Sequence, residues 1–401
     1  MRLDLPSGPA HLTYCANIHR GETWPETFAA LRQYLPAVRQ QVSPSAPMGV
    51  GLRLSALAAE ALEQPAAFAA LRDFLAAEDL YVFTINGFPY GPFHGQPVKE
   101  QVYAPDWRQP ERLAYTDRLA GLLAALLPDG ETGSVSTVPG AFRVAGAEPG
   151  ARIAIGEALL RHVARLARLE AETGRRIMLA LEPEPMCLLE TTAEAVGFLE
   201  EQVLGRHALA RFAGLAGCGT ARAEALLRRH LGLCLDVCHA AVEFESPGES
   251  VALLRRAGIA VAKLQLSSAL AVGRPDAEAA SLLRRFDDGV YLHQVVERRP
   301  DGSLRRFLDL PEALASLPAG PDGHEWRVHC HVPVFLDGVG RLGTTQDALR
   351  EVLALQRAEG ISPHLEVETY TWDVLPSEWR SADLAQAIAR ELLWVRDRLL
   401  S

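Results

Sequence analysis

Short apolar runs that end in polar residues recur along the whole chain, and each is followed by a stretch of helical periodicity. Strands and helices that alternate in this way predict a parallel sheet with right-handed crossovers. The simplest closed arrangement of eight such units is a (β/α)₈ barrel. The eight runs are His11–Asn17, Met48–Leu54, Leu80–Asn86, Ile177–Glu182, Leu231–Asp236, Val261–Leu266, Trp326–Val332 and His364–Thr369.

An open doubly wound sheet is the structural alternative, but no GxGxxG follows the first run, so its dinucleotide-binding form has no support. Two connections are longer than plain crossovers. Residues 87–107, after the third run, are rich in aromatic residues, Gly and Pro, which favours a lid. After the sixth run, Val290–Glu297 and Ser303–Leu308 flank Asp301-Gly302 and predict a β-hairpin. We expect one domain, residues 1–401, with both insertions.

Composition narrows the function. The net charge of -10 argues against nucleic acid, because phosphate backbones are bound by basic patches, and favours a small-molecule metabolite. The N-terminus lacks a signal-peptide pattern and no apolar run approaches the roughly 20 residues that cross a bilayer, so we expect a cytoplasmic protein. The six cysteines are scattered through apolar segments, which is typical of reduced, buried thiols.

Every predicted strand carries polar residues at or near its end, and active sites of barrels are built at the C-terminal strand ends. We therefore expect these side chains to converge: Asn17 with His19, Arg53, Asn86, Glu182, Asp236, Gln265, His329 with His331, and Glu366 with Glu368.

Carboxylates that converge in an apolar barrel mouth require a cation, because like charges held close together raise one another's pKa. Glu182, Asp236 and Glu368 supply anionic oxygens, and Gln265 and His331 could add a carbonyl oxygen and an imidazole nitrogen. Such an oxygen-rich set suits a divalent metal, with Mn²⁺ favoured and Co²⁺, Mg²⁺ or Zn²⁺ possible.

Several of these residues also have a structural interpretation. His239 could cap the helix after Asp236, and one of His329 and His331 could be a hydrogen-bonded core histidine. Glu366 lies one layer deeper than Glu368, as a second-layer carboxylate or a partner of Lys263. As substrate-binding residues we predict Asn17, His19, Arg53, Asn86 and His329.

Three motifs resemble the metal-binding strands of the xylose-isomerase-like barrel superfamily of sugar isomerases and epimerases: Leu181-Glu182-Pro183-Glu184-Pro185, Asp236-Val237-Cys238-His239 and Glu366 to Trp372. The resemblance implies a strand-four Glu, a strand-five Asp followed by xxHis, a strand-six His and a strand-eight Glu around the metal. Glu182, Asp236 and Glu368 match three of these positions. It also implies that Glu182 and Glu368 serve as acid and base and that His239 contacts the substrate. Gln265 departs from the pattern, so either Gln265 or His331 completes the metal shell.

More narrowly, Thr13 to His19 with Gly21 to Trp24, Asn86 to Tyr90, and Glu368 to Trp372 look like the bacterial metabolite traffic family EboE, with a likeness that runs nearly end to end. This resemblance implies a role in processing or exporting a secondary-metabolite precursor alongside a membrane prenyltransferase-like partner.

Three functions follow as hypotheses. The leading one is a metal-dependent isomerase or epimerase of a sugar-like or α-hydroxycarbonyl compound, in which two carboxylates move a proton. The second is metal-assisted hydrolysis, and the third is a non-catalytic metal-pocket protein that binds or carries a metabolite. The glutamine at position 265 keeps the third hypothesis open.

Overall fold

The computed structural model describes residues 1–373, 375–376 and 383–401. Eight parallel strands form its larger sheet, and a ninth, β1 (Arg2–Leu5), pairs antiparallel with the first of them. The parallel strands are β2 (Gly8–Tyr14), β3 (Met48–Arg53), β4 (Leu80–Asn86), β5 (Thr132–Thr137), β6 (Arg176–Leu181), β7 (Leu231–Asp236), β8 (Ala260–Leu266) and β15 (His364–Val367).

The sheet closes on itself between β2 and β3, which stand near the two ends of the strand order. Cys15 and Gly51 form a parallel bridge across this seam. The Thr13 hydroxyl strengthens it, because it donates to the Gly49 carbonyl at 2.8 Å and accepts from the Gly51 backbone N–H at 3.1 Å. The predicted (β/α)₈ barrel is confirmed.

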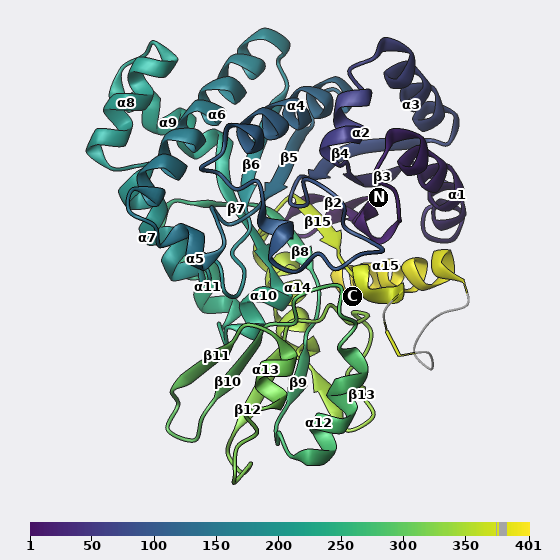
Figure 1. Cartoon of the computed structure of the whole chain (residues 1–401). Coiled ribbons are helices and arrows are strands. Elements are labelled where there is room, and N and C mark those ends of the chain that lie inside the picture. The colour runs from purple at the N-terminus through teal and green to yellow at the C-terminus, as the bar shows by residue number, and fades with distance from the viewer. Residues whose placement is uncertain (374, 377–382) are drawn as a thin grey trace.

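Helices surround the barrel (Figure 1), and the sequence sets where they begin. Thr23 with Glu26, and Thr191 with Glu194, form capping boxes that satisfy the first backbone N–H groups of α1 and α7. The helices are α1 (Trp24–Val42), α2 (Ala56–Ala61), α3 (Pro65–Ala77), α4 (Pro110–Leu126), α5 (Arg143–Gly146), α6 (Ala151–Thr173), α7 (Thr192–Gln202), α8 (Arg206–Ala216), α9 (Thr220–His230), α10 (Val237–Val242), α11 (Pro247–Ala257), α12 (Ala277–Leu283), α13 (Leu310–Leu314), α14 (Gln346–Glu359) and α15 (Leu384–Leu400). None of the described helices combines the length and apolar character that a membrane crossing requires.

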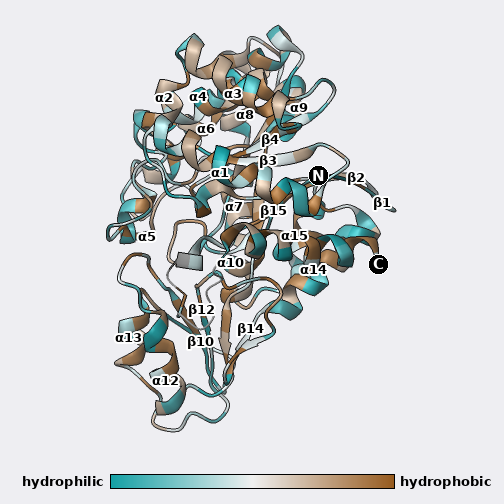
Figure 2. Ribbon diagram, turned by 90° about the vertical axis from the view of Figure 1, so that its right-hand side faces the viewer, coloured by the Kyte–Doolittle hydropathy of each residue, from teal (hydrophilic) through white to brown (hydrophobic). Residues whose placement is uncertain are grey.

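A second sheet lies beyond one end of the barrel in both views (Figures 1 and 2). Its strand order is β11-β10-β12-β9-β14-β13, and its pairs are antiparallel. The strands are β9 (Leu270–Val272), β10 (Val295–Arg298), β11 (Leu304–Phe307), β12 (Glu325–Val328), β13 (Gly338–Val339) and β14 (Leu342–Thr344). The predicted hairpin is confirmed as β10 and β11, and it forms part of this larger insertion between β8 and β15.

Two strand predictions were wrong. Trp326–Val332 is not a barrel strand, because Glu325–Val328 forms β12 of the second sheet. The remaining barrel strand is supplied by β5, Thr132–Thr137, which was not predicted as a strand. It lies in the connection between the third and fourth predicted runs. β6, β7 and β8 therefore each move one place, so that Glu182 and Asp236 stand at the ends of the fifth and sixth barrel strands and Gln265 lies on the seventh, while β15 remains the eighth.

Candidate metal and substrate site

A pocket with an empty volume of about 540 Å³, including its open mouth, lies at the C-terminal ends of the barrel strands. The barrel contributes polar side chains from the strand ends and the residues just after them: Asn17, Asn86, Glu182, Glu184, His239 and Glu368. The loop after β4 and the insertion complete the pocket, and they include His329 and His331 just beyond β12. Strand ends far apart in sequence therefore meet at one mouth, as barrel geometry requires.

Glu182, Asp236 and Glu368 form a buried carboxylate cluster, with one oxygen of each within 4.8 Å of the others. The side-chain amides of Asn17 and Asn86 donate to Glu368 Oε1 at 2.7 and 2.9 Å. Asp236 Oδ1 accepts from the Ser267 hydroxyl at 2.8 Å and from the His239 backbone at 2.9 Å. In both Glu368 and Asp236, these hydrogen bonds fix one of the two carboxylate oxygens.

Two other oxygens of the cluster are left without a hydrogen bond within the described part of the chain. Glu182 Oε2 and Asp236 Oδ2 are buried and have no hydrogen-bond partner among the described residues. Burial, reinforced by the charges of Glu368 and Asp236, raises the pKa of Glu182 well above its ordinary value. Burial and the neighbouring Asp236 raise the pKa of Glu368 to about 8. A bound cation would favour the ionised form of all three carboxylates.

Three histidines, His239, His329 and His331, line the pocket, and a hydrogen bond at Nδ1 fixes the orientation of each ring. Nδ1 of His239 donates to the Pro183 carbonyl at 3.0 Å, and Nδ1 of His331 donates to the Glu368 carbonyl at 2.8 Å. Nδ1 of His329 lies 2.7 Å from the side-chain oxygen of Gln294. Because these oxygens can only accept, each ring carries its hydrogen on Nδ1 and presents the Nε2 lone pair.

Burial also keeps two of the rings neutral, as ligand histidines must be. It lowers the pKa of His331 to about 4 and the pKa of His329 well below its ordinary value. Nε2 of both rings is buried without a hydrogen-bond partner among the described residues. A metal ligand set of carboxylate oxygens and Nε2 atoms is therefore present, and the residues fit a divalent ion.

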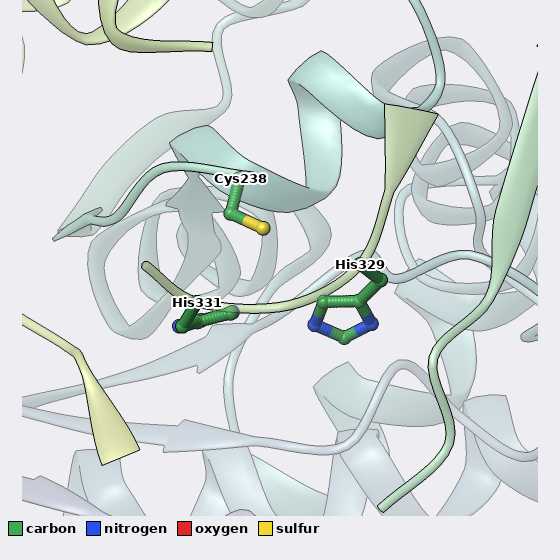
Figure 3. A group of neighbouring side chains, drawn as sticks. All are labelled: Cys238, His329 and His331. Atoms are coloured by element: carbon green, nitrogen blue, oxygen red, sulfur yellow. The ribbon is translucent and has the colours of Figure 1, made fainter. Parts of the chain in front are cut away.

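The potential ligand atoms form overlapping groups, each within 4.8 Å. Asp236, His239 and His331 form one group, and Glu184, His239 and His329 form another. Figure 3 shows a third, in which Cys238 stands beside His329 and His331. Burial raises the pKa of the Cys238 thiol well above its ordinary value, and its side chain packs in an apolar cluster with Val242, Ala269 and Val296. The carboxylates and imidazoles are the better ligands.

Four predicted residues do not line the pocket: Asp236, which belongs to the carboxylate cluster, and Gln265, His19 and Arg53. Gln265 is fully buried, and neither of its amide atoms has a hydrogen-bond partner among the described residues. The ring of His19 stacks on Tyr34 at 4.3 Å and bonds the Tyr14 hydroxyl at 2.8 Å. Arg53 donates to the carbonyls of Gly21 and Gly91, at 2.9 and 2.5 Å.

Glu366 lies beneath the pocket, paired with Lys263 at 2.5 Å, and both side chains are fully buried. This contact agrees with the interpretation of Glu366 as a partner of Lys263. Burial alone would lower the pKa of Lys263, but the charge of Glu366 outweighs it and raises that pKa. The barrel interior thus holds one fixed positive charge near the carboxylates.

Sequence reasoning missed several pocket residues. Glu184 follows Glu182 by two positions, a spacing that could have indicated a shared direction. Its Oε1 accepts from the Tyr103 hydroxyl at 2.7 Å, and burial raises its pKa. Tyr103, Tyr291 and Tyr370 also line the pocket, and they come from loops whose positions no periodicity predicts.

No protein-family model and no curated protein matches the chain. Among solved structures, a xylose isomerase-like TIM barrel protein from Mycobacterium smegmatis in complex with magnesium aligns with a TM-score of 0.51 and 14% identity, over 97% of this chain and 96% of that one. The IOLI protein with a binding zinc atom aligns with a TM-score of 0.47 and 14% identity, over 98% of both chains. The 3-keto-D-glucoside 4-epimerase YcjR from E. coli aligns with a TM-score of 0.41 and 14% identity, over 86% of this chain and 89% of that one. The chain thus has the fold of the xylose isomerase-like TIM barrels.

Proposed function

We propose that the protein is a divalent-metal-dependent isomerase or epimerase of a sugar-like or α-hydroxycarbonyl metabolite. The observation that carries the proposal is a set of buried atoms at the barrel mouth that have no hydrogen-bond partner among the described residues: Glu182 Oε2, Asp236 Oδ2 and Nε2 of His331. Buried polar groups are normally hydrogen-bonded, so this convergence favours a ligand that satisfies them together.

Glu182, Asp236, Glu368 and His331 would hold the metal, and Gln265 remains a candidate fifth ligand. When bound, the ion would act as a Lewis acid that stabilises negative charge developing on adjacent substrate oxygens. Oxygen-rich ligands with one imidazole suit Mn²⁺, which we favour. The M. smegmatis protein of the same fold is recorded with magnesium, which supports a hard divalent ion.

The chain's own carboxyl groups would move the proton. In the metal-free protein burial raises the pKa of Glu368 to about 8, and Asn17 and Asn86 hold its Oε1 in place, so Glu368 would serve as one acid or base. Glu182, also raised in pKa, would be the second acid or base. Asn86, His239 and His329 line the pocket and would contact the substrate.

The test is isotope exchange. Manganese-loaded protein is incubated in D₂O with a panel of ketoses and aldoses, and deuterium incorporation and product are followed by NMR. We expect Glu182→Gln and Glu368→Gln each to lower exchange by about 10²-fold or more. Glu312→Gln, an exposed residue of α13, is the matched control. Unchanged turnover in both site variants would refute the mechanism, and retained ligand without any exchange would favour a non-catalytic carrier.

Metal-assisted hydrolysis is a second candidate, favoured by the Glu184, His239 and His329 group beside the carboxylates. Two-metal hydrolases place their ions about 3.5–4 Å apart. Two equivalents of tightly bound metal, with phosphodiester cleavage, would support this candidate over the isomerase.

The resemblance to the bacterial metabolite traffic family suggests a proposal about the cellular role of the protein. We infer a cytoplasmic, single-domain protein that processes a secondary-metabolite precursor with a membrane prenyltransferase-like partner. Recovery of such a partner from crosslinked native membranes, and loss of the metabolite in a deletion strain, would test it. Unchanged metabolite levels in the deletion strain would refute it.

A further inference from the structure

The two sources of the pocket wall differ in character. Strand ends of the barrel supply the amides and carboxylates. The loop after β4 and the segment before β10 supply mainly apolar side chains: Phe88, Phe93, Val98, Val102, Tyr291 and Leu292. One ligand that fills the pocket would therefore meet both a polar and an apolar surface.

The apolar part is held together by aromatic contacts. The ring of Phe93 lies 5.2 Å from that of Tyr291 and 5.3 Å from that of Tyr370, and the two tyrosine rings lie 5.0 Å apart. Such separations are those of favourable aromatic pairs. Three segments that lie far apart in the sequence thus form one joint aromatic surface against the pocket.

The charge of the pocket is unfavourable for a phosphate. Apart from histidine, the only basic side chain among the described lining residues is Lys99, whose Nζ pairs with Asp309 at 2.6 Å. Arg53 binds backbone carbonyls and does not line the pocket. Glu182, Glu184 and Glu368 add acidic groups instead. Phosphate recognition normally requires Arg, Lys or a helix N-terminus.

We propose that the substrate is an uncharged molecule with two parts: a hydroxycarbonyl or vicinal-diol head that meets the carboxylates, and a hydrocarbon or aromatic portion that packs on the apolar wall. Phosphorylated sugars are excluded. This inference rests on the proposed metal site, because the head is placed by it.

The test uses two uncharged chelators that share a head and differ in tail. Acetohydroxamate and octanohydroxamate are titrated calorimetrically into manganese-loaded protein, with D-fructose and D-fructose 6-phosphate as competitors. Burial of the longer tail should make octanohydroxamate bind at least tenfold more tightly than acetohydroxamate. D-Fructose 6-phosphate should compete no better than D-fructose.

Two other outcomes have different meanings. Equal affinity of the two hydroxamates, or stronger competition by the phosphate, would overturn the two-part substrate while leaving the metal site intact. If neither hydroxamate binds to protein that elemental analysis shows to contain manganese, the metal does not face the pocket, and the proposed function fails together with this inference.

Variants locate the apolar wall. Phe93→Ala should reduce the affinity ratio of the two hydroxamates at least fivefold, with acetohydroxamate binding unchanged. Val102→Thr keeps the shape of a half-buried side chain and should reduce the ratio about threefold, since it replaces one methyl group by a hydroxyl. Val144→Thr, at a position 76% exposed, is the matched control. An unchanged ratio in both pocket variants would contradict the assignment.

Discussion

His331 donates its Nδ1 hydrogen to the backbone carbonyl of Glu368 at 2.8 Å. The two residues come from different sheets, because His331 follows β12 of the insertion and Glu368 follows β15 of the barrel. The Thr371 hydroxyl also donates to the His331 carbonyl. The insertion thus places an imidazole beside the carboxylates and the His239 ring that the barrel supplies.

Replacement of His331 should weaken metal binding. His331→Gln removes the Nε2 lone pair, and we expect manganese affinity, measured by calorimetry, to fall about 10–100-fold or more, since even outer-shell changes have effects of that size. His207→Gln, on the exposed face of α8, is the control. Equal affinity in His331→Gln and wild type would show that the insertion contributes no ligand.

The metal-free protein should lose stability as pH rises. The pKa of Glu368 is about 8 in the folded state and near 4.5 ordinarily, so the folded state binds more protons between these values. By linkage, the free energy of unfolding then falls as pH increases from about 4.5 to 8, on the order of a few kcal/mol. Urea denaturation at several pH values measures this slope.

A variant of Glu368 is the control for this pH dependence. Glu368→Gln cannot ionise, so the variant should show a shallower slope over this pH range. Manganese should reverse the trend in wild type, because metal binding releases the protons and tightens as pH rises. A flat profile for the metal-free wild type would contradict the burial of uncompensated carboxyl groups.

Removing one partner of the buried Lys263–Glu366 ion pair should lower the free energy of unfolding. Lys263→Met leaves Glu366 without its partner in the barrel interior and should lower the free energy of unfolding by about 3–5 kcal/mol. The double variant Lys263→Met with Glu366→Leu should lose less than Lys263→Met alone, because no buried charge remains. Additive losses would show that the two side chains act independently.

Gly51 should be irreplaceable at the barrel seam. A Cβ atom there would lie 1.8 Å from Glu366 Oε1 and 2.8 Å from the Tyr14 carbonyl oxygen. Gly51→Ala should therefore destabilise the protein by several kcal/mol, about 1–3 from overpacking and more from displacing Glu366. Gly121→Ala, within α4 and with open space around it, should instead stabilise by about 0.5–1 kcal/mol. Thermal melts distinguish the two, and a neutral Gly51→Ala would contradict the seam geometry.

Seven of the barrel strands were predictable because they are short, largely apolar runs that end in polar residues, and most of their residues are buried. β5 was missed because its sequence, Thr-Gly-Ser-Val-Ser-Thr, is polar. It is nevertheless buried, since hydroxyls satisfy one another, as Ser134 and Thr84 do at 2.8 Å. β12 was misplaced, although its alternating half-buried and buried residues are typical of an antiparallel sheet.

The carboxylate cluster was predictable because strand ends of a barrel converge wherever the strands lie in the order. That rule does not determine which side chains face the pocket. Arg53 and His19 turn to local partners, a backbone carbonyl and Tyr34, which no strand pattern reveals. The positions of Glu184 and of Tyr103, Tyr291 and Tyr370 depend on connecting segments whose conformation is set by tertiary packing.

Metal content tests the central claim most directly. Protein purified without chelator, and reconstituted with excess Mn²⁺ before desalting, is analysed for bound metal in wild type and in the double variant Asp236→Ala with Glu368→Ala. The account predicts about one tightly bound divalent ion in wild type and none in the double variant. Wild-type protein that binds no metal after incubation with Mn²⁺, or a double variant that retains it, would contradict a metal centre at the barrel mouth.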